Sequence, residues 1–146
     1  QWAIDAEASS VYAEPEWGAE QATGPPDAPR CGDYQFAWAS AASDEIATLE
    51  LTYETPVYVS RIEIIQSFNP NQVVKVVLMD PEDEFITVYQ DSPVVVDRPC
   101  PYSLTINVDE LDFKSDKIRI TVDQSILGLG WNEIDAVLLE GVENKQ

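Results

Sequence analysis

The sequence predicts an all-β domain, an antiparallel β-sandwich of about eight strands. From residue 47 onward the chain falls into short runs in which apolar and polar residues alternate, and no segment has the apolar spacing of an amphipathic helix. The links between these runs are too short for the crossover helices that a parallel sheet requires. With 146 residues, 45% of them apolar, we expect one domain over residues 1–146. The start at Gln1 rather than at Met leads us to expect a domain excised from a larger protein.

The first third of the chain, residues 1–46, is expected to form loops. This region is rich in Ala, Gly, Pro and Ser and shows little periodicity. Its segment 24–29 (GPPDAP) excludes both a regular helix and a central strand.

The strands begin with an alternating run at residues 47–54, in which Leu49, Leu51 and Tyr53 share one face. Apolar residues keep that parity up to Val59 and then change to the opposite parity at residues 62–64. A bend or β-bulge is therefore expected at Ser60–Arg61.

The remaining strands follow in order, separated by turns. Residues 73–78 are almost continuously apolar, which predicts a central strand buried on both faces. Further strands are expected at 85–89, 104–108, 117–122 and 133–139, and turns or loops at 69–72, 80–84 and 109–114.

Charge and composition exclude several classes of function. Lys and Arg number 8 against 27 Asp and Glu, giving a net charge of −19. This charge argues against nucleic acid and against an anionic membrane surface as partners, since few cations are available to replace phosphate counterions. The chain contains no His, which removes His-based catalytic triads and HExxH zinc sites.

No arrangement of residues indicates an enzyme. Ser and Cys lack a His partner, and no phosphate-binding glycine motif occurs. Among 27 acidic residues, a pair of carboxylates does not by itself mark a glycosidase site. We therefore expect a non-catalytic domain.

The two cysteines, Cys31 and Cys100, each lie beside strand-breaking residues. Loop cysteines in an acidic, His-free domain suggest a Cys31–Cys100 disulfide formed in an oxidising compartment. The alternative is two free, partly buried thiols.

Calcium is a candidate ligand of the first third. Calcium takes six to eight oxygen ligands from carboxylates and carbonyls, and residues 20–27, followed by Asp33, form a turn-rich acidic stretch. The alternative is that these are turn residues with solvated acids. There is no EF-hand loop.

Aromatic residues in or beside the expected loops are candidates for sugar binding. Sugar rings stack on exposed aromatic faces while neighbouring polar groups bond their hydroxyls. Core packing is the alternative for each aromatic residue, and it is the interpretation we favour for Trp38. The more open candidates are Trp17, Tyr34, Phe68 and Trp131.

Three motifs, in order, give the chain a family resemblance. PVYVSRIEI follows the alternating run that begins at residue 49, NPNQVVKVVLMD begins at residue 69, and EIDAVLLEG begins at residue 133. Together with the preceding loop WGAEQATGPPD, CGD and AWAS, this order resembles the galactose-binding-like β-sandwich superfamily. That superfamily includes discoidin (coagulation-factor type C) domains and many carbohydrate-binding modules. Similar segments occur in bacterial surface proteins, metalloproteases and F-box proteins.

The resemblance implies a jelly-roll sandwich of about eight strands, with a structural calcium ion in many members. Carried onto this sequence, the metal ligands would be Gln21, Asp27 and Asp33 in the loop and Glu133 at the start of the last strand, with Asp135 as a second candidate for that closing position. The usual loop pattern of Asp-Gly followed by Thr and Trp is replaced here by GPPDAPRCGDYQFAW.

Ligands in this superfamily usually bind at loops on one end of the sandwich. The residues of this sequence expected to converge there are Tyr34, Phe36, Phe68, Asn69, Trp131 and Asn132. The expected function is a non-catalytic carbohydrate-binding module of an extracellular or surface protein, with a glycan or an extracellular protein as partner. The alternative is a protein-interaction or structural accessory domain of the same fold that binds no sugar.

Overall fold

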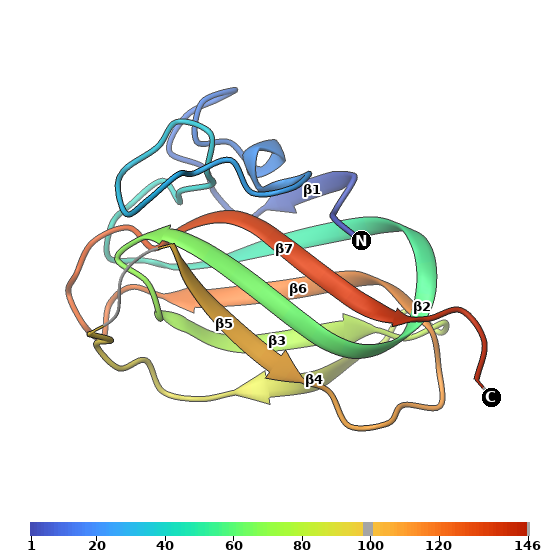
Figure 1. Ribbon diagram of the computed structural model, residues 1–146. Helices are drawn as coiled ribbons and strands as arrows, with labels where there is room; N and C mark the ends of the chain where they lie inside the picture. The colour runs from blue at the N-terminus through green and yellow to red at the C-terminus, as the bar shows by residue number, and fades with distance from the viewer. Residues whose placement is uncertain (98–100, 146) are drawn as a thin grey trace.

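The protein is described by a computed structural model over residues 1–97 and 101–145, and it is almost entirely β (Figure 1). One 3-10 turn, η1 (Ala19–Ala22), precedes the long strands. No helix in the described part of the chain has the length and apolarity needed to cross a membrane. The strands of the described residues are β1 (Asp5–Ala8), β2 (Ile46–Phe68), β3 (Val73–Met79), β4 (Phe85–Gln90), β5 (Tyr102–Asn107), β6 (Ser115–Asp123) and β7 (Glu133–Val142).

The strands form two layers that share β2. One layer has the order β1-β2-β6-β3-β4, and in the other β5 and β7 both pair with the second half of β2. Every pair is antiparallel. The predicted antiparallel sandwich is confirmed, with seven strands in the described residues where about eight were expected.

β2 passes from one layer to the other at the place where its apolar residues change from odd-numbered to even-numbered positions. Its first half pairs with β6 and its second half with β7, with irregularities of register between Thr52 and Val57 and between Val59 and Arg61. The predicted bend at Ser60–Arg61 is therefore confirmed. Because of the change in parity, the apolar residues of both halves face the same core.

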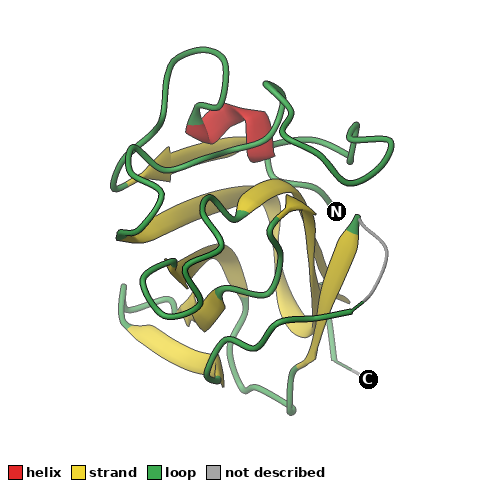
Figure 2. Cartoon of the chain, turned by 90° about the vertical axis from the view of Figure 1, so that its left-hand side faces the viewer, coloured by secondary structure: helices red, strands yellow, loops and turns green. Residues whose placement is uncertain are grey.

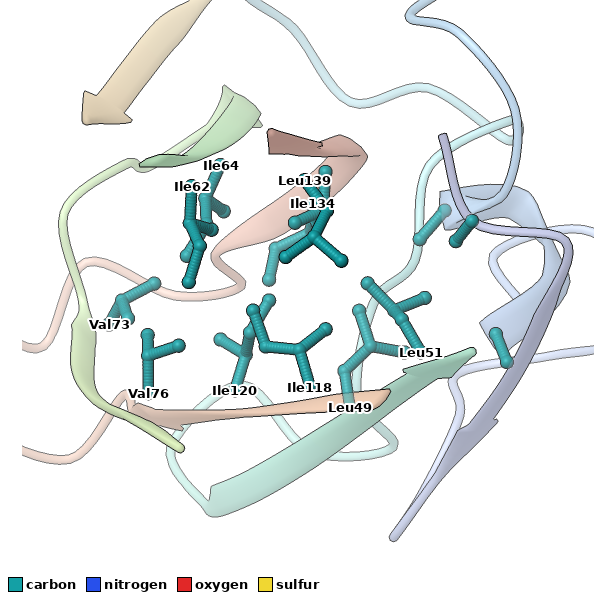
Figure 3. Close-up of a cluster of buried hydrophobic side chains, with 14 of the residues drawn as sticks. Leu49, Leu51, Ile62, Ile64, Val73, Val76, Ile118, Ile120, Ile134 and Leu139 are labelled. Atoms are coloured by element: carbon teal, nitrogen blue, oxygen red, sulfur yellow. The ribbon is translucent and has the colours of Figure 1, made fainter. Parts of the chain in front are cut away.

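The core lies between the two layers (Figure 3). Ile62, Ile64 and Leu139 point inward from one layer, and Ile118 and Ile120 point toward them from the other. All five side chains are at most 1% exposed. β3 lies between β6 and β4 and has buried residues on both faces, as the apolar run at residues 73–78 predicted.

The first third of the chain is more ordered than expected. β1 pairs with β2, and isolated bridges join Trp2 to Leu138 and Trp38 to Ile134. These contacts hold the first 45 residues against the body of the sandwich. Figure 2 shows the end of the molecule where the loops gather. We call this end, formed by loops 31–36, 69–72, 91–97 and 124–132, the loop end.

Candidate functional site

Loop 31–36 is fixed between the end of β2 and the start of β7. The N–H of Gly32 donates a hydrogen bond of 2.7 Å to the carbonyl oxygen of Ser67. The N–H of Tyr34 donates to Oε1 of Glu133 at 3.0 Å. Both bonds join segments far apart in the sequence, so the loop is held in one place at the loop end.

A hollow of about 440 Å³ opens on one side of this loop. It combines the apolar surfaces of Phe68 and Leu129 with the side-chain amide of Asn69, a mixture that suits a ligand with apolar and polar faces. We call it the Phe68 hollow; it is lined by Cys31, Gly32, Phe68, Asn69, Pro70, Val95, Val96 and Leu129.

Tyr34 and Phe36 form a stacked pair next to the Phe68 hollow. Their ring centroids lie 5.0 Å apart with an interplanar angle of 25°. A Cβ atom at Gly32 would lie only 3.2 Å from Cε2 of Tyr34, so glycine lets the ring lie close to the loop backbone. Four of the predicted ligand-binding residues, Tyr34, Phe36, Phe68 and Asn69, therefore lie near one another.

A second, smaller pocket of about 90 Å³ is lined in part by Asp33 of the same loop. We call it the aromatic pocket; it is lined by Tyr12, Trp17, Asp33, Ala39, Trp131 and Glu133. The Tyr12 ring meets Trp17 edge to face at 5.2 Å and Trp131 at 5.4 Å between centroids. Trp131, predicted to bind ligand, thus lies in this pocket rather than in the Phe68 hollow.

Two carboxyl groups lie within the aromatic pocket. Glu133 is 1% exposed, and burial raises its pKa to about 9, with a further contribution from the neighbouring Asp33. Asp33 itself is exposed and accepts a hydrogen bond of 2.8 Å from the indole Nε1 of Trp17.

Asp135, two residues further along β7, faces a different carboxyl group. Its Oδ2 accepts hydrogen bonds of 3.0 Å from the N–H groups of Asp27 and Ala28. Its Oδ1 is buried and has no hydrogen-bond partner within the described residues. Burial and the adjacent Asp27 side chain raise the pKa of Asp135.

Asn132 is completely buried and its polar groups bond to other parts of the protein. Its Oδ1 accepts a hydrogen bond from the N–H of Gln72, its Nδ2 donates to Oε1 of Gln66, and its backbone N–H donates to Oε1 of Gln124. The bonds measure 2.8, 3.0 and 2.7 Å. In the structure Asn132 therefore joins the turns of the loop end and lines neither pocket.

The residues expected to bind calcium do not lie together. Asp33 lies beside Glu133, and Asp27 lies beside Asp135, while the side-chain amide of Gln21 donates to the carbonyl oxygen of Pro15. Within residues 1–97 and 101–145, no three Asp, Glu or Cys side chains gather in an arrangement that could hold a metal ion.

The predicted disulfide involves one residue that is not described. Cys31 lines the Phe68 hollow and is not a free thiol, but Cys100 lies outside the described residues. The Cys31–Cys100 pairing therefore stays a prediction.

Tyr12 is an aromatic residue of these pockets that the sequence analysis did not identify. It is 52% exposed and lies in a loop with no periodic pattern. Its two aromatic partners come from separate segments, so only the fold shows the contact. The presence of several aromatics in loops was the one available signal.

A comparison with known protein families finds one whose model matches the whole chain. A family model described as "PAPPA: Pappalysin-1, SD scarf domain, C-terminal" matches residues 1–146. F-box/LRR-repeat protein 4 from Bos taurus is 22% identical over 106 residues, which are 66% of this chain and 17% of that protein. The chain therefore spans only about a sixth of that relative's length.

Solved structures share the fold at low sequence identity. Chitosan-binding module 1 of a chitosanase/glucanase from Paenibacillus sp. IK-5 matches with a TM-score of 0.71 and 14% identity over 94% of both chains. The family 32 carbohydrate-binding module of C. perfringens NanJ, solved in complex with galactose, matches with a TM-score of 0.66 and 16% identity, covering 92% of this chain and 91% of that one. The fold is thus the galactose-binding-like β-sandwich that the sequence motifs predicted.

Proposed function

The chain belongs to the family of the pappalysin-1 C-terminal SD scarf domain, and we propose that it is a non-catalytic carbohydrate-binding module. The observation that supports this most directly is the Phe68 hollow. It lies among the loops at one end of the sandwich, has about 440 Å³ of space and presents both an aromatic ring and a side-chain amide. A sugar ring offers the matching surfaces, an apolar C–H face and hydroxyl groups.

The similar solved structures agree with this proposal. The Paenibacillus module is titled as chitosan-binding, and the C. perfringens module was solved with galactose. We further propose that residues 1–146 form one domain of a larger extracellular or surface protein. The predicted Cys31–Cys100 disulfide, if formed, would agree with this location, because structural disulfides persist in oxidising compartments.

We also propose a structural calcium ion with Asp27 and Asp135, rather than Glu133, as its two carboxylate ligands; backbone carbonyls and water would complete the six to eight oxygens that calcium takes. The buried Oδ1 of Asp135 lacks a hydrogen-bond donor in the described residues and lies beside a second carboxyl group. A hard cation would satisfy both groups and would neutralise their repulsion. Bound there, calcium would hold the 23–28 loop against β7.

The calcium proposal is tested by thermal unfolding with EDTA and with calcium chloride. Calcium at about one hundred times its dissociation constant should stabilise the wild type by about 2.7 kcal/mol. Asp135→Asn should abolish this response, whereas Asp109→Asn, an exposed acid in another loop, should keep it. An equal response in the wild type and in Asp135→Asn would refute the assignment.

A protein-binding or structural accessory role is the second candidate, and one observation favours it. Four apolar side chains near the loop end are well exposed: Val94 at 58%, Val95 at 67%, Ile126 at 57% and Leu129 at 38%. Exposed apolar side chains that cluster together mark sites of protein interaction.

A glycan array separates the two candidates. We expect the isolated domain to bind a defined set of glycans, Phe68→Ala to lose that binding, and Tyr58→Ala to retain it. Tyr58 is a partly exposed aromatic residue where β2 crosses between the layers. A blank array, with a folded domain shown by circular dichroism, would reject sugar binding in favour of the accessory role.

A further inference from the structure

We propose that the aromatic pocket binds the protonated amine of an amino sugar. This inference rests on the proposed sugar-binding function and names the class of glycan. It concerns the pocket formed by Tyr12, Trp17 and Trp131 with the carboxyl groups of Asp33 and Glu133, and not the Phe68 hollow.

Three aromatic rings line the pocket. Tyr12 meets both indoles nearly at right angles, at 81° to Trp17 and 78° to Trp131, so the three rings enclose a space from different directions. Ring faces carry negative potential, and an ammonium group together with its neighbouring C–H groups is attracted to them.

The polar edges of both indoles are already used within the protein. Nε1 of Trp17 donates to Asp33 at 2.8 Å, and Nε1 of Trp131 donates to the carbonyl oxygen of Ser40 at 2.9 Å. These bonds fix the ring orientations before any ligand arrives. A ligand in the pocket would therefore meet the rings rather than the N–H donors.

The charged group that the pocket exposes is a carboxylate. It belongs to Asp33, whereas Glu133 is 1% exposed and accepts the N–H of Tyr34 within the protein. No Lys or Arg is among the lining residues that the structure describes. A net charge of −19 adds a field that attracts cations. The pocket therefore favours a cationic ligand over a neutral or an anionic one.

The pocket suits an organic cation better than a metal ion. Calcium requires six to eight oxygen ligands, whereas most of this wall consists of aromatic carbon. An ammonium group on a carbon atom can use the Asp33 carboxylate and the aromatic rings together.

Size and position restrict the cation further. About 90 Å³ is too small for a whole sugar ring but accommodates an ammonium group and the carbon that bears it. The two sites are neighbours along one loop: Gly32 lines the Phe68 hollow, and the next residue, Asp33, lines the aromatic pocket. A glycan lying over the hollow could thus reach the pocket with an amine on a neighbouring sugar.

The test is a titration with three oligosaccharides of equal length, built from glucosamine, from N-acetylglucosamine and from glucose. Intrinsic fluorescence reports on Trp17 and Trp131, and calorimetry gives the dissociation constants. We expect the glucosamine oligomer to bind about tenfold or more tightly than the other two, in line with a cation–π and carboxylate contact. Asp33→Asn and Trp131→Ala should each remove this preference, and Asp109→Asn should keep it.

Three outcomes would overturn the proposal. Equal affinity for the three oligomers would reject the amine while leaving sugar binding intact. A preference that survives both Asp33→Asn and Trp131→Ala would place amine recognition elsewhere. If the glycan array identifies ligands but the glucosamine oligomer does not bind, amine recognition is wrong while sugar binding still stands. A blank array, in contrast, would reject sugar binding itself.

Discussion

The body of the sandwich and its loop end are held together by different forces. In the body, apolar side chains from β2, β3, β6 and β7 bury one another between the layers (Figure 3). At the loop end, buried amides such as Gln66, Gln72 and Asn132 join separate loops through hydrogen bonds. Stability should therefore depend mainly on the body, and binding on the geometry of the loop end.

The largest expected effect concerns the covalent link at the loop end. If Cys31 and Cys100 are bonded, reduction should lower the free energy of unfolding by about 4 kcal/mol at most, since the bond closes a long loop. Peptide mapping by mass spectrometry without reductant should show the crosslinked pair. Recovery of two alkylatable thiols from native protein would contradict it.

The next effect belongs to the body. Ile120→Ala removes a side chain that is completely buried between the layers, and it should cost about 3 kcal/mol. Urea denaturation measures this loss. Glycan affinity per folded molecule should be unchanged; a large change in affinity would show that body and loop end are not separable.

Replacing Asn132 should lower the free energy of unfolding by less than Ile120→Ala does, but it should also weaken glycan binding. Asn132→Ala leaves the N–H of Gln72 and the Oε1 of Gln66 with one partner fewer, which should cost about 1–3 kcal/mol. Because both partners support the turn beside Phe68, glycan binding should also weaken. Asn107→Ala, on an exposed position of β5, is the matched control and should change neither quantity.

The smallest effect on stability is expected at Tyr12. Its ring is about half exposed, so Tyr12→Ala should cost less than about 1 kcal/mol. The same substitution removes one wall of the aromatic pocket and should lower the affinity for the glucosamine oligomer about tenfold. Thermal unfolding measures the stability and calorimetry the affinity, on one preparation. A large loss of stability with unchanged affinity would show that Tyr12 stabilises the fold and does not bind the ligand.

The same contrast explains what the sequence could predict. The strands of the body follow from alternation, and even the crossing of β2 near Arg61 is visible as a change of parity. β1 was missed because its sequence DAEA has little β propensity; it forms a strand by pairing with β2.

At the loop end, the type of a residue helped to predict site residues, but its place in the sequence did not show which way its side chain points. Tyr34, Phe68 and Asn69 were predicted as site residues because aromatic and amide groups in loops suit a sugar, and the structure places them at the loop end. Asn132 was grouped with them because it follows Trp131. Successive residues of an extended chain point in opposite directions, so Trp131 lines a pocket while Asn132 is buried.

Glycan binding at the loop end is tested most directly by NMR with the ¹⁵N-labelled domain, titrated separately with galactose and with the glucosamine oligomer. The account predicts that at least one of these ligands shifts amide signals of loop 31–36 and of the Phe68 and Trp131 segments. Signals of residues 109–114, at the far end of the sandwich in Figure 1, should stay in place. Shifts confined to the far end, or none with either ligand, would contradict a sugar site at the loop end.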